Sequence, residues 1–283
     1  MEKEGKDNYL TINGLRLHYL EWGRESGTEG ECILLLHGIS GHAHLWDFSV
    51  SELVGDCHLL ALDLRGYGDS QWAKPPAYHS QDYMSDLVAF VTKLSLNNFV
   101  LIGHSLGSLL GTIYAASYPD RLKGLVLVDI EACPPSWQPE YLHKAGQKAQ
   151  PKFNSLEGMV AYERKQPTGP QFAPADVVRY NCYHGGRKLP DGKLTYKYDR
   201  TTLVHFDQYD TRALLPQIKC PALVIRGEHS VVMRAEVAQN MSRLLPRGIF
   251  KEMPNAGHIV YVDNPSGFAQ AVTEFLKSFT THN

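Results

Sequence analysis

The sequence predicts one large α/β domain, with a mostly parallel β-sheet flanked by helices and an inserted, mainly helical cap. Short apolar segments alternate with amphipathic helical segments in the first half of the chain and again near its end, a pattern typical of parallel sheets covered on both faces. One long stretch without this alternation interrupts the pattern. The total of 283 residues is enough for such a domain with an insertion and a sizeable core.

The chain opens with a predicted β-hairpin. Residues 9–12 and 15–21 flank Asn13-Gly14, a dipeptide that favours two-residue hairpin turns. The later apolar segments are predicted strands, at residues 33–36, 58–62, 99–102, 125–128, 222–226 and 248–253. Amphipathic segments predict helices, at residues 80–94, 105–117, 235–245 and 265–279.

Residues 133–214 are predicted to form the cap, so that residues 1–132 and 215–283 make up the core. The segment is rich in proline and tyrosine and contains two short helical patterns, 155–165 and 174–183, and a turn at 189–193. Its aromatic content argues against a floppy loop, because disordered segments are poor in aromatic residues. We expect an ordered insertion over the carboxyl edge of the sheet, where a ligand pocket would form.

The composition argues against nucleic-acid and membrane partners. The formal net charge is −2, which predicts no basic surface for either, and the longest apolar runs are too short to span a bilayer. The first seven residues are polar and charged and show no secretory signal. The five cysteines include no C-x-x-C pair, which argues against a disulfide framework and a zinc site. We therefore expect a cytoplasmic protein, as a monomer or a homodimer.

A candidate nucleophile lies in the segment Gly103-His104-Ser105-Leu106-Gly107. The segment follows a predicted strand and opens a predicted helix, which is the context that the G-x-S-x-G nucleophile elbow requires. The glycines permit a sharp strand-to-helix turn, and the amides of the helix N-terminus suit a developing oxyanion. The competing interpretation is a helix-capping serine between two packing glycines. The strand before it and the helix after it favour Ser105 as a nucleophile.

The predicted strand 33–36 is followed by His37-Gly38, and here the chain resembles the α/β-hydrolase superfamily over nearly its whole length. In that family a loop after this strand lies beside the nucleophile and completes the oxyanion hole. The resemblance implies that the backbone amides of Ile39 and Leu106 are the two donors. The segment 63–70 is similar to the family's D-x-R-G-x-G-x-S turn, which we interpret as structural.

The resemblance also implies that His258 is the general base. It follows Pro254-Asn-Ala-Gly in the loop between the last strand and the last helix, where the family carries its catalytic histidine. His42 and His44 could suggest a metal, but two histidines without an acid or thiol partner are a weak zinc signal. We expect no metal and no cofactor.

The acid of the triad is where the chain departs from its family. The expected acid positions, after the strand 222–226, hold Ser230 and Val231, and neither carries a carboxylate. Asp129 is the preferred candidate, because it ends the predicted strand 125–128 and some similar sequences place their acid there. Glu228, two or three residues before the expected position, is the alternative. Glu131 is a third candidate, and a site without a working acid remains open.

A serine hydrolase acting on a carboxylic ester or lactone through an acyl-enzyme is the predicted function. The chain most resembles the small esterases and lactonases of this fold, including those that act on acyl-homoserine lactones. Two alternatives stay open: a carbon–carbon bond hydrolase or cofactor-free haloperoxidase on the same scaffold, and a non-catalytic small-molecule-binding protein. Trp137, Phe153 and Tyr183 of the cap are candidates for the wall of an apolar acyl pocket, and each is equally a candidate for the cap's own core.

Overall fold

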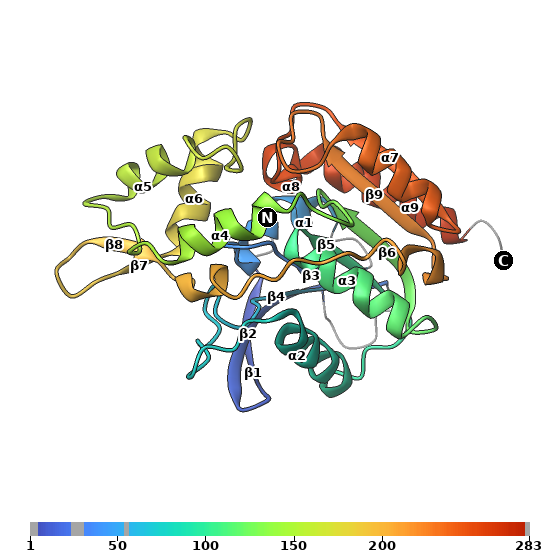
Figure 1. Ribbon diagram of the computed structural model, residues 1–283, viewed down its shortest axis with the longest axis horizontal. Helices are drawn as coiled ribbons and strands as arrows, with labels where there is room; N and C mark the ends of the chain where they lie inside the picture. The colour runs from blue at the N-terminus through green and yellow to red at the C-terminus, as the bar shows by residue number, and fades with distance from the viewer. Residues whose placement is uncertain (1–4, 24–30, 54–56, 281–283) are drawn as a thin grey trace.

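The computed structural model describes residues 5–23, 31–53 and 57–280, and it contains the predicted α/β architecture (Figure 1). An eight-stranded sheet has the order β1-β2-β4-β3-β5-β6-β9-β10. Every strand pair from β4 to β10 is parallel, whereas β2 is antiparallel to both of its neighbours. The strands are β1 (Lys6–Ile12), β2 (Leu15–Trp22), β3 (Cys32–Leu36), β4 (His58–Leu62), β5 (Phe99–His104), β6 (Leu122–Val128), β9 (Ala222–Gly227) and β10 (Gly248–Met253).

The hairpin of β1 and β2 turns at the predicted dipeptide. Asn13 and Gly14 have φ angles of 48° and 79°, and their neighbours Ile12 and Leu15 are paired across the two strands. A two-residue turn with positive φ at both positions matches the twist of the flanking strands. Asparagine and glycine are the residues that adopt this conformation at least cost.

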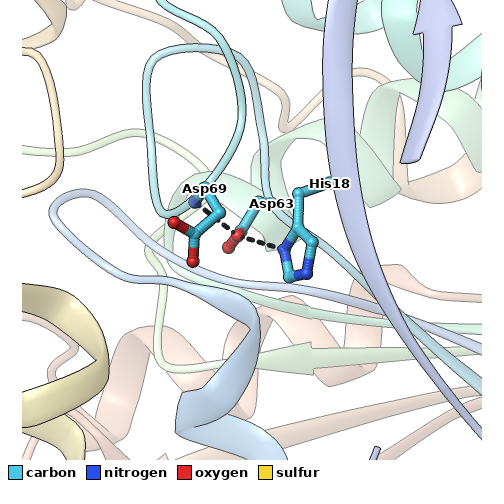
Figure 2. Close-up of side chains that lie close together, drawn as sticks. All are labelled: His18, Asp63 and Asp69. Atoms are coloured by element: carbon cyan, nitrogen blue, oxygen red, sulfur yellow. Dashed lines mark hydrogen bonds and ion pairs between the residues drawn. The ribbon is translucent and has the colours of Figure 1, made fainter. Parts of the chain in front are cut away.

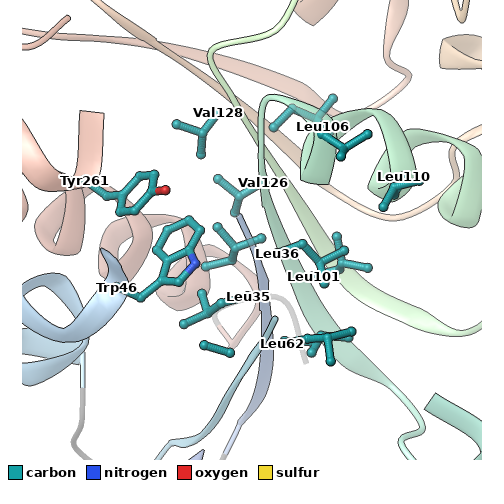
Figure 3. Packing of buried hydrophobic residues seen from close by; sticks show 14 of the residues in the cluster. Leu35, Leu36, Trp46, Leu62, Leu101, Leu106, Leu110, Val126, Val128 and Tyr261 are labelled. Carbon is teal, nitrogen blue, oxygen red and sulfur yellow. The ribbon is translucent and has the colours of Figure 1, made fainter. Parts of the chain in front are cut away.

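Helices pack on both faces of the sheet, and the core lies between them and the strands. Helices α1 (Asp47–Leu53) and α9 (Pro265–Thr280) contact each other, as do α2 (Ser80–Lys93) and α3 (Leu106–Ser117). Figure 3 shows Trp46 and Tyr261 on one side of the central strands and Leu106 and Leu110 of α3 on the other. The rings of Trp46 and Tyr261 are stacked with centroids 3.7 Å apart. The remaining core helices are α7 (Ala235–Leu244) and α8 (Val260–Asp263).

The region predicted as the cap contains three α-helices and a small two-stranded sheet. Its helices are α4 (Trp137–Gly146), α5 (Leu156–Glu163) and α6 (Ala175–Gly185), and its strands are β7 (Gly186–Lys188) and β8 (Leu194–Tyr196). Helices α5 and α6 contact each other and lie with β7 and β8 at the left of the view, away from α7 and α9 (Figure 1). The predicted turn at 189–193 connects β7 to β8 and contains Gly192 with a φ of 83°. Helix α4 and the short strands were not predicted.

All five cysteines are free thiols. Within the described part of the chain, the helices all fall short of the length and apolarity that a membrane span needs.

Candidate active site

Ser105 lies on the sharp turn between β5 and α3. Its φ and ψ are 49° and −114°, a conformation that is strained for a residue other than glycine. The surrounding backbone is too close for side chains: a Cβ on Gly103 would lie 2.2 Å from the carbonyl oxygen of Gly107, and one on Gly107 would lie 2.2 Å from that of Leu36. The two glycines of the motif therefore let α3 pack directly on the sheet and hold Ser105 at the carboxyl edge.

The loop after β3 lies against the nucleophile. A Cβ on Gly38 would be 2.9 Å from the Cβ of Ser105, so only glycine permits this approach. The Gly38 carbonyl accepts hydrogen bonds from His37 Nδ1 at 2.7 Å and from the Gly41 amide at 3.0 Å. The same peptide unit carries the Ile39 N–H, whose direction is thereby fixed opposite to the carbonyl.

His37 has a defined tautomer. Its Nε2 accepts a hydrogen bond from the Leu64 amide at 3.1 Å, so the ring hydrogen is on Nδ1, which donates to Gly38. Burial lowers the pKa of His37, which favours the neutral ring that both contacts require. The second predicted oxyanion donor, the Leu106 N–H, belongs to the first residue of α3, where no intrahelical acceptor exists. The oxyanion roles of Ile39 and Leu106 stay predictions.

Asp129 and His258 are in contact. His258 Nδ1 lies 3.1 Å from Asp129 Oδ1, and both residues are buried. Asp129 follows β6 directly and has a φ of 49°, and its amide donates to the Ile225 carbonyl at 2.8 Å. A carboxylate on Nδ1 leaves the lone pair on Nε2, which is the tautomer that a general base needs.

The two other candidate acids have different partners. The Glu131 carboxylate is buried and bound by Arg234, with Nε to Oε1 at 2.8 Å and Nη2 to Oε2 at 3.1 Å. Glu228 is half exposed, accepts from the Asn255 amide at 3.2 Å and lies 3.5 Å from the His229 ring. Of the three carboxylates considered from the sequence, Asp129 is the one that the structure brings to His258.

Ser230, at the expected acid position, also contacts Asp129. Its hydroxyl donates to Asp129 Oδ1 at 2.5 Å, and the Gly227 amide donates to Oδ2 at 3.0 Å. The exposed Val231 makes no such contact in the described structure; 61% of its surface is accessible. Sequence reasoning noted Ser230 only as a missing carboxylate and did not predict this hydrogen bond.

His104, the variable residue of the nucleophile motif, supports the histidine loop. Its Nε2 donates to the His258 carbonyl at 3.0 Å, and its Nδ1 lies 3.4 Å from the Tyr261 hydroxyl. The rings of His104 and His258 are 4.5 Å apart. Burial holds the pKa of His104 well below its ordinary value, and the nearby His258 adds to this effect. A neutral His104 therefore connects the nucleophile turn to the loop that carries His258. The sequence analysis named it only as part of the nucleophile motif.

Asp263 of α8 connects the same loop to the cap region. Its Oδ2 accepts from the Gly257 amide at 2.8 Å, next to His258, and its Oδ1 accepts from the amides of Phe172 and Ala173 at 2.9 and 3.1 Å. Burial raises the pKa of Asp263, although these amides oppose the shift. One carboxylate therefore links the segment before α6 to the loop that carries the candidate base.

The predicted pocket residues occupy different surroundings. Phe153 is buried, and its ring packs against Tyr162 and Tyr196 within the cap region. Trp137 and Tyr183 are largely exposed, with 61% and 67% of their surfaces accessible. The structure therefore places Phe153 in a local core, which was the alternative considered for it. The acyl-pocket role of the three stays a prediction.

The one group of three or more metal-ligating side chains found among the described residues is His18, Asp63 and Asp69 (Figure 2). Its donor atoms already have partners. His18 Nδ1 is 2.7 Å from Asp63 Oδ2, the Ala43 amide donates to Asp63 Oδ1, and the Lys197 ammonium is 2.6 Å from Asp69. The Lys197 ammonium already places a positive charge beside Asp69, so we interpret this cluster as structural.

His42 and His44 do not converge on a common point. His42 Nε2 donates to the Asn181 carbonyl at 3.1 Å, and His44 Nδ1 donates to Asp47 at 2.8 Å. Their ring centroids are 6.4 Å apart, and the His44 ring instead lies against His184 at 3.8 Å. These contacts join the loop after β3 to α6.

With a parallel sheet, a serine on a strand-to-helix turn and a histidine–aspartate pair at the same edge, the molecule has the design of an α/β-hydrolase. A family model described as the α/β-hydrolase fold matches residues 31–174. The chain belongs to this family.

Three comparisons describe its similarity to known members. N-formylmaleamate deformylase of Pseudomonas putida is 29% identical over 278 residues, which is 94% of this chain and 95% of that protein. The 2-(acetamidomethylene)succinate hydrolase of Mesorhizobium japonicum is 27% identical over 258 residues, 89% and 90% of the two chains. The crystal structure of an E-2-(acetamidomethylene)succinate hydrolase superposes with a TM-score of 0.84 at 24% identity, covering 96% of this chain and 99% of that one.

Proposed function

We propose that the protein is a serine hydrolase that cleaves carboxylic ester or lactone bonds, with Ser105 as nucleophile, His258 as general base and Asp129 as the acid. The observation that carries the proposal is the contact between Asp129 Oδ1 and His258 Nδ1, at the edge of the sheet where Ser105 follows β5. It supplies the third member that the chain lacks at the family's usual position. The order serine, acid, histidine along the chain fits the same scheme.

The proposed reaction has two halves. Ser105 Oγ attacks the carbonyl carbon while His258 Nε2 takes its proton, and the oxyanion is bound by the amides of Ile39 and Leu106. Collapse of the tetrahedral intermediate expels the alcohol, which receives the proton from the imidazolium. A water molecule, deprotonated by His258, then attacks the acyl-enzyme and releases the carboxylic acid and Ser105. Asp129 stabilises the imidazolium in both halves.

Cleavage of an amide is a second candidate for the same site. The names of the two relatives specify an acetamido group and an N-formyl group, and the same nucleophile, base and oxyanion donors serve amides and esters alike. An amide differs in needing a protonated nitrogen to leave, so it depends more strongly on His258 as an acid. Carbon–carbon bond cleavage would use the same residues, and substrates for it are tested together with esters and amides below.

Ser105→Ala should reduce the hydrolysis of short p-nitrophenyl esters by several orders of magnitude, because only binding and oxyanion effects remain without the nucleophile. Ser117→Ala, a matched serine at the exposed end of α3, should keep wild-type rates. A fluorophosphonate should label the wild-type chain at Ser105 and fail to label the variant.

The substrate class follows from rates on a panel of p-nitrophenyl esters, γ-lactones, N-acyl amides and C–C cleavage substrates with the wild-type protein. The highest kcat/KM on an ester or a lactone is the expected result. An amide preferred by more than about tenfold would establish the second candidate. Wild-type labelling without turnover of any panel member would remove the ester proposal, and near-wild-type activity of Ser105→Ala would remove the serine mechanism.

A further inference from the structure

Ser230 contacts the acid of the candidate site. It follows β9 in the turn 227–230, where the Ser230 amide donates to the Gly227 carbonyl at 3.0 Å. Strand β9 lies beside β6 in the sheet, so this turn lies next to the residue that follows β6, which is Asp129. The Ser230 hydroxyl and Asp129 Oδ1 are 2.5 Å apart.

The direction of this hydrogen bond follows from the other partners of the hydroxyl. Ser230 Oγ accepts from the amides of Val232 and Met233, both at 3.1 Å. A serine hydroxyl has two acceptor positions and one hydrogen. With both acceptor positions occupied by amides, the hydrogen is left to donate, and the acceptor within reach is Asp129 Oδ1. The hydroxyl is therefore oriented by its own turn toward the acid.

Asp129 Oδ1 is the same oxygen that lies 3.1 Å from His258 Nδ1. Terminal torsions of aspartate are broad, so one hydrogen bond from the Gly227 amide to Oδ2 at 3.0 Å leaves the carboxylate free to rotate about its last bond. Two donors lie on Oδ1, His258 Nδ1 and the Ser230 hydroxyl, and the Ser230 hydroxyl, oriented by its own turn, restricts that rotation. Gly227 and Ser230, two residues of one turn, hold the two oxygens of Asp129 from the β9 side.

We propose that Ser230 is a positioning residue that holds the Asp129 carboxylate in the orientation in which Oδ1 accepts from His258. The inference rests on the proposed function for its kinetic consequence, but its geometric consequence is independent of turnover. Ser230 occupies one of the two positions where the family's acid is expected. There it supplies a hydrogen bond to an acid that follows the neighbouring strand.

The kinetic test compares Ser230→Ala with Ser230→Thr, each made in the wild-type chain and in Asp129→Asn. Ser230→Ala should lower kcat about 10- to 100-fold, the usual effect of losing a hydrogen bond to a charged group, with KM changed less than about twofold. Ser230→Thr, which keeps the hydroxyl, should restore kcat to within about threefold of wild type. In the Asp129→Asn background Ser230→Ala should change kcat by less than about twofold, because coupled residues are not additive.

Ser242→Ala is the matched control, because its hydroxyl caps an exposed carbonyl of α7, away from the site; it should leave kcat unchanged. A purely structural role for Ser230 in its turn predicts equal losses of kcat in the two backgrounds, and that result would overturn the proposal. An unchanged kcat in Ser230→Ala would do the same.

A crystal structure of Ser230→Ala provides a readout that needs no activity. The Asp129 carboxylate should rotate so that Oδ1 moves out of hydrogen-bond range of His258 Nδ1, and an unmoved carboxylate would contradict the proposal. If the carboxylate rotates but the wild-type chain neither turns over the substrate panel nor labels at Ser105, the proposed function fails while the positioning role stands.

Discussion

At the scale of single residues, the candidate site depends on two strained backbone positions. Ser105 and Asp129 both have a φ of 49°, and they follow the neighbouring strands β5 and β6. The Ser105 amide donates to the Val128 carbonyl at 3.0 Å, and the Asp129 amide donates to the Ile225 carbonyl at 2.8 Å, so each turn is tied to the next strand. Such conformations cost about 1–3 kcal/mol each and persist only where the surroundings impose them.

Replacing the acid tests its assignment directly. Asp129→Asn should lower kcat by roughly 10³- to 10⁴-fold, because the amide stabilises the wrong tautomer of His258. Glu228→Gln should lower kcat less than about tenfold, since Glu228 is half exposed and bound to the Asn255 amide. Steady-state kinetics on one p-nitrophenyl ester would give both values, and a larger loss in Glu228→Gln would transfer the role to that residue.

The sequence predicted the candidate-site residues that lie at recognisable positions along the chain. It did not predict the contacts that depend on the orientation of a side chain. Ser105 and His258 lie in recognisable loops, and Asp129 follows a predicted strand. The parts played by His37, His104 and Ser230 depend on which ring nitrogen or hydroxyl hydrogen faces which neighbour. That information arises only when β9 is placed beside β6 and the loop after β3 is placed beside β5. No pattern in one sequence specifies it.

At the scale of elements, several side-chain contacts link the cap region to the core. Asp263 of α8 binds three amides from two segments, and the His44 ring lies against His184 of α6. The long helices α2, α3, α7 and α9 were predicted because their apolar period is sustained. Helix α4 was not, because Pro139 and the sparse apolar residues of its ten positions hide that period.

Asp263→Asn should loosen at least one of the two segments that the carboxylate holds. An asparagine side chain offers one acceptor oxygen in place of two, so one side must lose its hydrogen bond. Amide hydrogen exchange should speed up at Phe172 and Ala173, at Gly257, or at both, and kcat/KM should fall about tenfold, as for one lost hydrogen bond to a charged group. Asp120→Asn, at an exposed site, is the control. Unchanged exchange at all three amides would show that the link does not depend on Asp263.

The aromatic residues of the cap region should separate into two classes. Phe153→Ala should lower the free energy of unfolding by about 3–5 kcal/mol, as truncation of a buried phenylalanine does. Trp137→Ala and Tyr183→Ala should leave stability nearly unchanged and alter the ratio of rates on butyrate and octanoate esters. Denaturant titration and ester kinetics measure the two effects. An unchanged ratio in both exposed variants would place the acyl pocket elsewhere.

At the scale of the whole molecule, buried neutral histidines make the fold sensitive to acid. Burial lowers the pKa of four histidines: the pKa of His42 falls to about 3 and that of His184 to about 4, and those of His37 and His104 are lowered as well. His18 is the exception. Burial, the largest single cause, would lower its pKa too, but the hydrogen bonds to Asp63 and Asp7 and the charges of Asp63 and Asp69 together outweigh it and raise the pKa.

The free energy of unfolding should therefore fall as pH drops from about 6.5 towards 4. In this range these histidines bind protons in the unfolded chain but not in the folded one. This difference in proton binding lowers the free energy of unfolding as the pH falls. Urea titrations across the range measure it, and His42→Gln should show a shallower fall than wild type. His18→Gln should lower the free energy of unfolding by a constant amount below about pH 6.5 and by progressively less at higher pH, because the stability that His18 adds is complete below about 6.5 and lost as pH rises. A wild-type curve that stays flat or rises toward pH 4 would contradict this account.

The order of the site residues along the chain has a consequence for biosynthesis. Ser105 and Asp129 follow β5 and β6, but His258 follows β10 and is 129 residues beyond its acid. A ribosome-bound chain that has reached β9 holds the proposed nucleophile and acid but not the proposed base. Because domains fold as units during synthesis, reactivity towards acyl groups should begin only after the sheet has received its last strand. On the proposed mechanism, a nascent chain without His258 has no base to activate Ser105, so it should not be acylated there.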